Sequence, residues 1–405
     1  MDLYITGDLA LARGIDKKVS EGAFDFFDPA LFKVFSNPDD FHLINLECPV
    51  TDSTEPQWAH FPTMKASTRA FEFVKQLHVD VASLANNHIS DYGTRGLWDT
   101  VNILEKHGIR WVGAGKTQEE ASAPLIVSKN ECTFGFLALA QKEISAAGKK
   151  SPGAAVLKAK HAVKSMAELA GKVDIAIAYL HFGPEFFEYP TPDQVELSRA
   201  LIDAGAHMVI GHHPHVVQGY EFYKNKLIAY SLGNFVFDMK PVLGSSQRLG
   251  MMIQASIVDK AIDKVTIHYV ETSRGRTVLL DSKSREDAKN HVDRLSAVLA
   301  DRNLLIERYY FTCRDHLMTY LSALINFLVK KRNLRNCYDW VVQLFWPQIF
   351  KMRVDLVKFI ISGKALAYEV KKGPPQEGIF AYAWRGVCYV GAAMKFVGGF
   401  LFTVK

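Results

Sequence analysis

The hydrophobic residues in the first two thirds of the chain gather in short apolar runs that polar stretches separate. Seven of these runs are rich in aliphatic residues, which is typical of buried strands: 3–6, 41–46, 81–85, 134–140, 173–180, 207–211 and 226–232. Helical periodicity between the runs predicts helices over 96–107, 155–171 and 192–205. Because strands and helices alternate, we predict an α/β fold in which layers of helix cover a buried central sheet. A closing antiparallel hairpin is expected over 251–259 and 264–271.

From about residue 285 the periodicity becomes helical and few strand signals follow. We therefore predict two parts, an α/β domain over 1–285 and a C-terminal helical appendage over 286–405. Residues 301–405 carry a net charge of +9 and 19 of the 47 aromatic residues, which favours binding to an anionic membrane surface. Arg385 and Lys395 interrupt the near-apolar end, which disfavours a membrane-spanning helix. A helical layer packed on the α/β domain is the alternative.

Composition and the first residues indicate the class of protein and the compartment in which we expect it. With 48% hydrophobic and 22% charged residues the chain is globular, and five scattered cysteines without a CxxC pair predict buried, reduced thiols. The first residues, MDLYITGD, lack a basic segment followed by an apolar one, so we expect no secretory signal. We predict a cytoplasmic protein, peripheral at the membrane, that does not bind nucleic acid.

Residues able to bind a metal ion directly follow five of the predicted strands. They are Asp8, Glu47, Asn87, His181, His213 and His215. Each alone has an ordinary structural explanation, such as a helix cap for Asp8, but their joint placement at strand ends favours a shared site. Carboxylate, amide and imidazole ligands without thiolate indicate a catalytic Mn²⁺, Fe²⁺ or Zn²⁺. The closely spaced His213 and His215 would suit two ions that a carboxylate bridges.

The same stretches carry a resemblance to a known family. The chain resembles the CapA family of bacterial capsule or poly-γ-glutamate synthesis proteins, whose fold is similar to calcineurin-type metallophosphatases. The matching stretches occur in family order over roughly the first 250 residues: 7–13, 45–51, 83–97, 113–121, 181–185, 204–221 and 230–238. The resemblance therefore implies a metallophosphatase-like, layered sheet-and-helix core.

The resemblance also implies roles for individual residues. Asp8 and His215 would hold one divalent ion, Asn87, His181 and His213 the other, and Glu47 would bridge them. His88, whose partner we expect to be Asp91, would protonate the leaving group or stabilise the transition state. We predict contacts to an anionic substrate from a further set: Arg13, Asn86, Glu185, Asn234 and Arg248.

Three features depart from the calcineurin-type pattern or from common family members. Ala10 stands where the calcineurin-type motif has a histidine, two residues after Asp8, and the bridging residue is a glutamate instead of an aspartate. Both features resemble what the CapA family generally shows. Family members commonly begin with a membrane anchor, and the sequence predicts none here.

These observations lead to one favoured hypothesis and two alternatives. We predict a metal-dependent hydrolase whose two divalent ions activate a hydroxide for attack on a phosphoester in an anionic small molecule or polymer. The first alternative is an assembly factor docked to a membrane-bound capsule-synthesis complex, with a vestigial or structural metal site. The second is a hydrolase that cleaves a γ-glutamyl amide.

Overall fold

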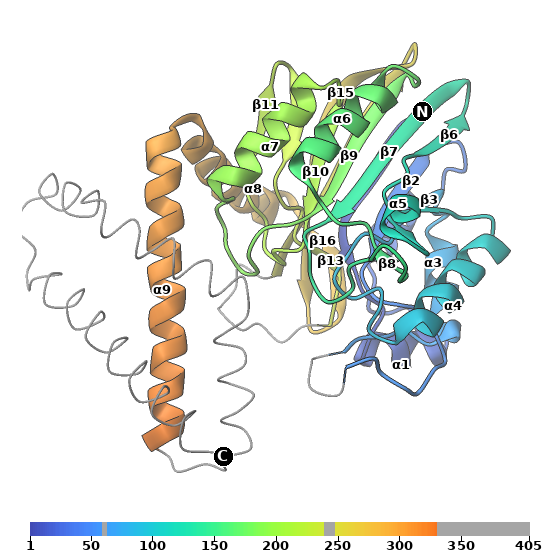
Figure 1. Ribbon diagram of the computed structural model, residues 1–405, viewed down its shortest axis with the longest axis horizontal. Coiled ribbons are helices and arrows are strands. Elements are labelled where there is room, and N and C mark those ends of the chain that lie inside the picture. Colours follow the sequence, from blue (N-terminus) through green and yellow to red (C-terminus); the bar gives the residue numbers. More distant parts are fainter. Residues whose placement is uncertain (59–62, 239–247, 330–405) are drawn as a thin grey trace, which may run out of the picture. The chain divides into compact units, whose positions relative to one another are not determined.

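The computed structural model describes residues 1–58, 63–238 and 248–329, and the side chains of residues 1–58, 63–238 and 248–315. Contacts divide the chain into two compact units, Met1–Tyr309 and Tyr310–Lys405. The first unit contains both large sheets (Figure 1). Everything that positions the candidate site lies in this unit.

The first large sheet has a parallel half and an antiparallel half. Its strand order is β16-β15-β14-β1-β2-β3-β4, and β13 pairs with β1. The parallel strands are β1 (Asp2–Leu9), β2 (Phe41–Leu46), β3 (Val81–Ser83), β4 (Arg110–Val112) and β13 (Asn234–Val236). The antiparallel strands are β14 (Leu249–Val258), β15 (Ala261–Ser273) and β16 (Arg276–Leu279). The parallel strands end at the same edge, where chemistry-bearing loops begin.

The second large sheet has the strand order β11-β12-β10-β9-β7-β6. Its four inner strands are parallel: β7 (Cys132–Ala140), β9 (Ile175–His181), β10 (Met208–His212) and β12 (Lys226–Ala229). The outer strands β6 (Leu125–Lys129) and β11 (Tyr220–Tyr223) run antiparallel to their neighbours. Two short strands, β5 (Ala114–Gly115) and β8 (Gly153–Ala154), pair with each other.

The two large sheets share one apolar core. Phe41 of β2 and Phe134 of β7 pack with ring centroids 4.7 Å apart, and both side chains are buried. A second apolar cluster joins the other face of the second sheet to helices α6 (Ala159–Ala170) and α7 (Pro192–Asp203), which Figure 1 shows beside β9 and β10. Strands buried on both faces explain the nearly continuous apolar runs in the sequence.

Six further helical segments lie before α6 in the described chain. They are α1 (Gly14–Ser20), α2 (Pro29–Val34), η1 (Thr68–Ala70), α3 (Phe71–Gln76), α4 (Gly93–Lys106) and α5 (Gln118–Ala121). Helix α7 illustrates how the sequence sets its ends. Thr191 forms a capping box with Gln194 before the first turn, and Gly205 follows the helix with a φ of 106°, which favours glycine.

The structure confirms the predicted α/β fold with its layered sheet-and-helix core. The predicted C-terminal appendage is helical as far as residue 329, and the rest of it lies outside the described residues. All seven predicted strands form, the predicted helices correspond to α4, α6 and α7, and β14 and β15 form the expected hairpin. The expectation of one central sheet was wrong, because the strands divide between two sheets. An apolar run shows that a strand is buried but does not identify its neighbour.

In the part of the chain that the structure describes, three helical elements follow β16: α8 (Ser282–Ala297), η3 (Val298–Ala300) and α9 (Arg302–Val329). Helix α8 lies in the first unit, where Ser296 Oγ accepts a hydrogen bond of 3.0 Å from the Tyr220 backbone N–H. The division between residues 285 and 286 stays a prediction. Among the described helices none is long and apolar enough to cross a membrane, and the described cysteines are buried. Arg385 and Lys395 lie outside the described residues.

Candidate metal centre

The six predicted metal ligands lie together at the carboxyl ends of parallel strands from both sheets. The first sheet supplies Asp8 in β1, Glu47 directly after β2 and Asn87 after β3. The second sheet supplies the last residue of β9, His181, and His213 and His215, which follow β10. All six side chains are buried. The site therefore depends on the way in which the two sheets pack, and neither sheet provides it alone.

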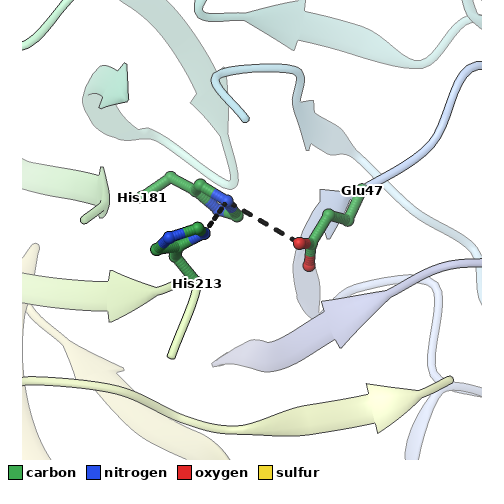
Figure 2. A group of neighbouring side chains, drawn as sticks. All are labelled: Glu47, His181 and His213. Carbon is green, nitrogen blue, oxygen red and sulfur yellow. Dashed lines mark hydrogen bonds and ion pairs between the residues drawn. The ribbon is translucent and has the colours of Figure 1, made fainter. Parts of the chain in front are cut away.

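The ligand atoms form two groups that share one carboxylate. Glu47, His181 and His213 offer ligand atoms that all lie within 4.8 Å of one another, and so do Asp8, Glu47 and His215. Figure 2 shows the rings of His181 and His213 and the Glu47 carboxylate facing a common point. Because Glu47 belongs to both groups, it is the carboxylate that would bridge two ions bound there.

The spacing within the first group fits a single metal ion. His181 Nε2 lies 2.9 Å from Asn87 Oδ1, 3.0 Å from His213 Nδ1 and 3.7 Å from Glu47 Oε1. Ligands at about 2.1 Å from one ion lie roughly 3.0–3.4 Å apart in octahedral or tetrahedral geometry. In the second group His215 Nε2 lies 3.6 Å from Glu47 Oε1, close to the same range.

The surroundings of Glu47 support a cation at this point. Both carboxylate oxygens of Glu47 are buried and have no hydrogen-bond partner among the described residues. Burial raises the pKa of the Glu47 carboxyl well above its usual range, and the nearby Asp8 charge raises it further. An ionised carboxylate buried without compensation costs several kcal/mol. Divalent ions would supply that compensation, so the residues fit the metal that they are expected to hold.

The histidines of the site are suited to bind metal as neutral rings. Burial lowers the pKa of His181, His213 and His215 below the usual histidine value, and nearby His213 lowers that of His181 further. A neutral imidazole presents a lone pair on one ring nitrogen. At neutral pH each ring can therefore act as a ligand without first losing a proton.

The backbone that carries two of these histidines is strained. His213 has a φ of 96° and His215 a φ of 57°, both in the region that favours glycine. Such conformations cost about 1–3 kcal/mol each and persist where surrounding contacts hold them. One such contact is the His213 N–H, which donates to Asp8 Oδ2 at 3.2 Å. The strain is thus located at the proposed ligands.

Two residues that sequence reasoning missed hold Asp8 in place. Asn45 Nδ2 and His212 Nδ1 each donate a hydrogen bond of 2.8 Å to Asp8 Oδ1. Burial by itself raises the pKa of the Asp8 carboxyl, but the hydrogen bond from His212 and the charges of the surrounding histidines together outweigh burial, and the net pKa is lowered. Asn45 is a polar residue inside the apolar strand β2, and His212 is the last residue of the apolar strand β10. That position was the signal available in the sequence.

Two residues predicted to contact substrate form hydrogen bonds inside the protein, and their substrate contacts stay predictions. Asn86 Nδ2 donates to Leu46 O at 2.9 Å, and its Oδ1 accepts from the His88 N–H at 3.1 Å. Asn234 Oδ1 accepts a hydrogen bond of 3.0 Å from His215 Nδ1, which leaves Nε2 on the Glu47 side. Both asparagines are buried, so their contacts make them positioning residues.

The His88 and Asp91 side chains form a hydrogen-bonded pair beside the ligand Asn87. His88 Nδ1 donates to Asp91 Oδ2 at 2.8 Å, and the same oxygen accepts from the Met64 N–H at 2.7 Å. The His88 side chain is 15% exposed, whereas that of Asp91 is 1% exposed. Burial lowers the pKa of His88, but the hydrogen bond and charge of Asp91 outweigh burial and raise the net pKa.

The remaining substrate candidates differ in their surroundings. Glu185 follows β9, and its pKa is raised by burial while the charges of His215 and His88 oppose that effect. Arg13 is exposed and donates to the backbone oxygen of Asp238 at 3.0 Å. Arg248 is exposed and follows the undescribed segment 239–247. Substrate contacts by these three residues stay predictions.

The sequence matches a protein family and is similar to individual bacterial proteins. Residues 2–239 match the family described as "Bacterial capsule synthesis protein PGA_cap". The chain is 33% identical over 244 residues to the "PGA biosynthesis protein CapA" of Bacillus subtilis, covering 57% of this chain and 62% of that protein. It is 28% identical over 247 residues to the "Capsule biosynthesis protein CapA" of Bacillus anthracis, covering 59% and 60%. The matched part thus spans about three fifths of each of these relatives.

Solved structures show similarity at low sequence identity. A novel phosphatase from Mycoplasma pneumoniae aligns with a TM-score of 0.41 and 11% identity, covering 71% of this chain and 96% of that chain. A 5′-nucleotidase precursor from Thermus thermophilus aligns with a TM-score of 0.39 and 14% identity, covering 73% and 58%.

Proposed function

The chain belongs to the PGA_cap family of bacterial capsule synthesis proteins, and from this premise we propose that it is a metal-dependent hydrolase of the metallophosphoesterase type. The proposed reaction is hydrolysis of a phosphoester in an anionic small molecule or polymer. The single observation that carries the proposal is Glu47, whose buried carboxylate has no hydrogen-bond partner among the described residues and belongs to both groups of ligand atoms.

The site would bind two divalent ions, each of them Mn²⁺, Fe²⁺ or Zn²⁺. Asn87, His181 and His213 would hold one ion, Asp8 and His215 the other, and Glu47 both. When bound, such a pair of ions polarises the scissile group and lowers the pKa of a water molecule that attacks it. Asn45 and His212 keep the Asp8 carboxylate in its orientation through hydrogen bonds.

His88 is the proposed general acid of the reaction. Asp91 accepts the hydrogen on Nδ1, so the ring is held in one orientation and Nε2 is left for the substrate. The hydrogen bond and charge of Asp91 oppose burial and raise the pKa of His88, which favours the protonated imidazole. A protonated ring can transfer its proton to the departing oxygen, which otherwise leaves as an unstable alkoxide. Asp91 acts through His88 and is a positioning residue.

Two alternatives each have an observation in their favour. The name of the Bacillus subtilis relative refers to PGA biosynthesis, which suits hydrolysis of a γ-glutamyl amide by the same centre. Ala10, two residues after Asp8, is buried and supplies no ligand, so the ion at Asp8 would be weakly held. A weakly held ion suits an assembly factor within a capsule-synthesis complex. The phosphoester proposal is preferred because the ligand set is otherwise complete.

The test combines metal content with a substrate panel. Protein purified without chelator is analysed for bound metals, and phosphodiesters, phosphomonoesters and γ-glutamyl peptides are supplied in parallel. The proposal expects two ions per chain and turnover of at least one phosphoester. Turnover of γ-glutamyl peptides alone supports the amide alternative, and bound metal without any turnover supports the assembly factor.

A further inference from the structure

The loop after β7 carries three polar residues, two of which contact the proposed ligand His213 and one of which contacts the backbone of the proposed ligand Asn87. Gln141 Nε2 lies 2.9 Å from His213 Nε2, and Glu143 Oε1 lies 3.3 Å from the same nitrogen. Ser145 Oγ donates to the backbone oxygen of Asn87 at 2.6 Å. None of the three residues is a metal ligand in the proposed centre. We call residues 141–145 the strap.

Gln141 has a fixed orientation within the strap. Its Oε1 accepts from the Gly183 N–H at 3.0 Å, and its Nε2 donates to Gly183 O at 3.1 Å. The same Nε2 donates to Glu143 Oε1 at 2.6 Å. Gly183 follows β9, the strand that ends in the ligand His181. The amide thus ties the strap to the second sheet and holds the Glu143 carboxylate against His213.

Binding of a metal ion through Nδ1 would determine which ring nitrogen of His213 carries the hydrogen. Nδ1 faces the ligand group, because it lies 3.0 Å from His181 Nε2. Nε2 lies 3.3 Å from Glu143 Oε1 and 2.9 Å from the Gln141 amide nitrogen, and of these two atoms only the carboxylate oxygen can accept a hydrogen. With a metal ion on Nδ1, Nε2 would carry the hydrogen and donate it to the Glu143 carboxylate. In that tautomer the lone pair of Nδ1 is free for a metal ion.

The strap also positions a ligand that comes from the other sheet. Ser145 is 2% exposed and accepts a hydrogen bond of 3.1 Å from the Ser90 N–H besides donating to Asn87 O. These two bonds span the loop 87–90, which carries both Asn87 and His88. One short segment thus holds two ligands, Asn87 and His213, that belong to the same proposed ion.

We propose that the strap is a positioning element for the ion bound by Asn87, His181 and His213, and that Glu143 orients His213 and makes it a stronger ligand. This inference rests on the proposed function, because it requires that site to hold a metal ion. A carboxylate that accepts the second N–H of a ligating histidine fixes its tautomer and increases its basicity. Removal of such a partner lowers metal affinity by about 10–100-fold.

The experiment measures Mn²⁺ binding to the full chain over a range of buffered free Mn²⁺, with bound metal determined by elemental analysis. Glu143→Ala should weaken one of two sites by about 10–100-fold and leave the other nearly unchanged. Glu143→Gln keeps a neutral acceptor and should give a smaller loss at the same site. Ser145→Ala should weaken that site too. Glu168→Ala, which removes an exposed glutamate of α6, is the matched control and should bind like the wild type.

The outcomes separate this inference from the proposed function. If the wild type binds two ions and the strap variants bind both with unchanged affinity, the strap has no positioning role although the metal centre stands. Equal weakening of both sites also contradicts the inference, because the contacts reach ligands of only one ion. If Glu143→Ala does not fold, Glu143→Gln and Ser145→Ala decide. A wild type that binds no Mn²⁺ overturns both proposals.

Discussion

Replacement of Glu47 by glutamine should abolish most of the stabilisation that metal ions give to the protein. In the metal-free wild type the Glu47 carboxylate is buried without a hydrogen-bond partner among the described residues. That arrangement costs several kcal/mol when the group is ionised. Glutamine keeps the size of the side chain but removes the charge. The metal-free variant should therefore be at least as stable as the metal-free wild type.

The magnitude of the metal effect follows from linkage. An ion at about 100 times its Kd stabilises the folded state by about 2.7 kcal/mol, so two ions add about 5 kcal/mol. For a domain of this size that corresponds to a rise in Tm of roughly 10 °C. Glu47→Gln weakens both sites, because Glu47 belongs to both ligand groups. Its Tm should rise by less than roughly 5 °C under the same conditions.

The assay is thermal unfolding of chelator-treated protein with and without Mn²⁺, followed by circular dichroism. Glu168→Gln serves as the control, since it removes a glutamate whose side chain is 59% exposed. This control should show the full shift of the wild type. Equal Mn²⁺ shifts in Glu47→Gln and the wild type would refute the bridging position of Glu47.

Three further predictions follow from the same geometry. His88→Ala should keep its metal content but lose about 10²–10⁴-fold in turnover, and loss of bound ions would place His88 among the ligands. In metal-free protein the raised Glu47 pKa stabilises the fold fully below about pH 4.3 and progressively less as pH rises through the folded pKa. Unfolding titrations should show this decline in the wild type but not in Glu47→Gln. The full chain should co-sediment with anionic liposomes, and high salt should weaken this binding. A chain ending at Tyr309 should not co-sediment. Binding of the full chain that does not change with salt concentration contradicts this prediction.

The sequence was informative about the ligands because their signal is local. Asp8 and Glu47 stand in or directly after apolar runs, and parallel strands bring such positions to one edge of a sheet. Local pattern could not show that the ligands come from two sheets that meet at the site. Pairing between strands depends on contacts between distant segments, which periodicity does not record.

The supporting residues were missed for the same physical reason. In the sequence, Asn45 and His212 are recognisable only as polar residues within or at the end of apolar strands. Their hydrogen bonds to Asp8 join residues that are 37 and 204 positions apart in the sequence. Glu143 has no motif around it, and its partner His213 comes from another loop. Substrate contacts by Asn86 and Asn234 stay predictions, and both side chains form hydrogen bonds with residues of the site.

Hydrolysis measured while Mn²⁺ is returned to chelator-treated protein tests the central claim most directly. The substrate is an activated phosphodiester, and the wild type and Glu47→Gln are compared at equal concentrations of folded protein. We predict that wild-type activity starts at background and rises as the second ion binds, and that Glu47→Gln stays near background. Activity that survives the chelator, or an equal rise in Glu47→Gln, would contradict a reaction that depends on a metal centre built around Glu47.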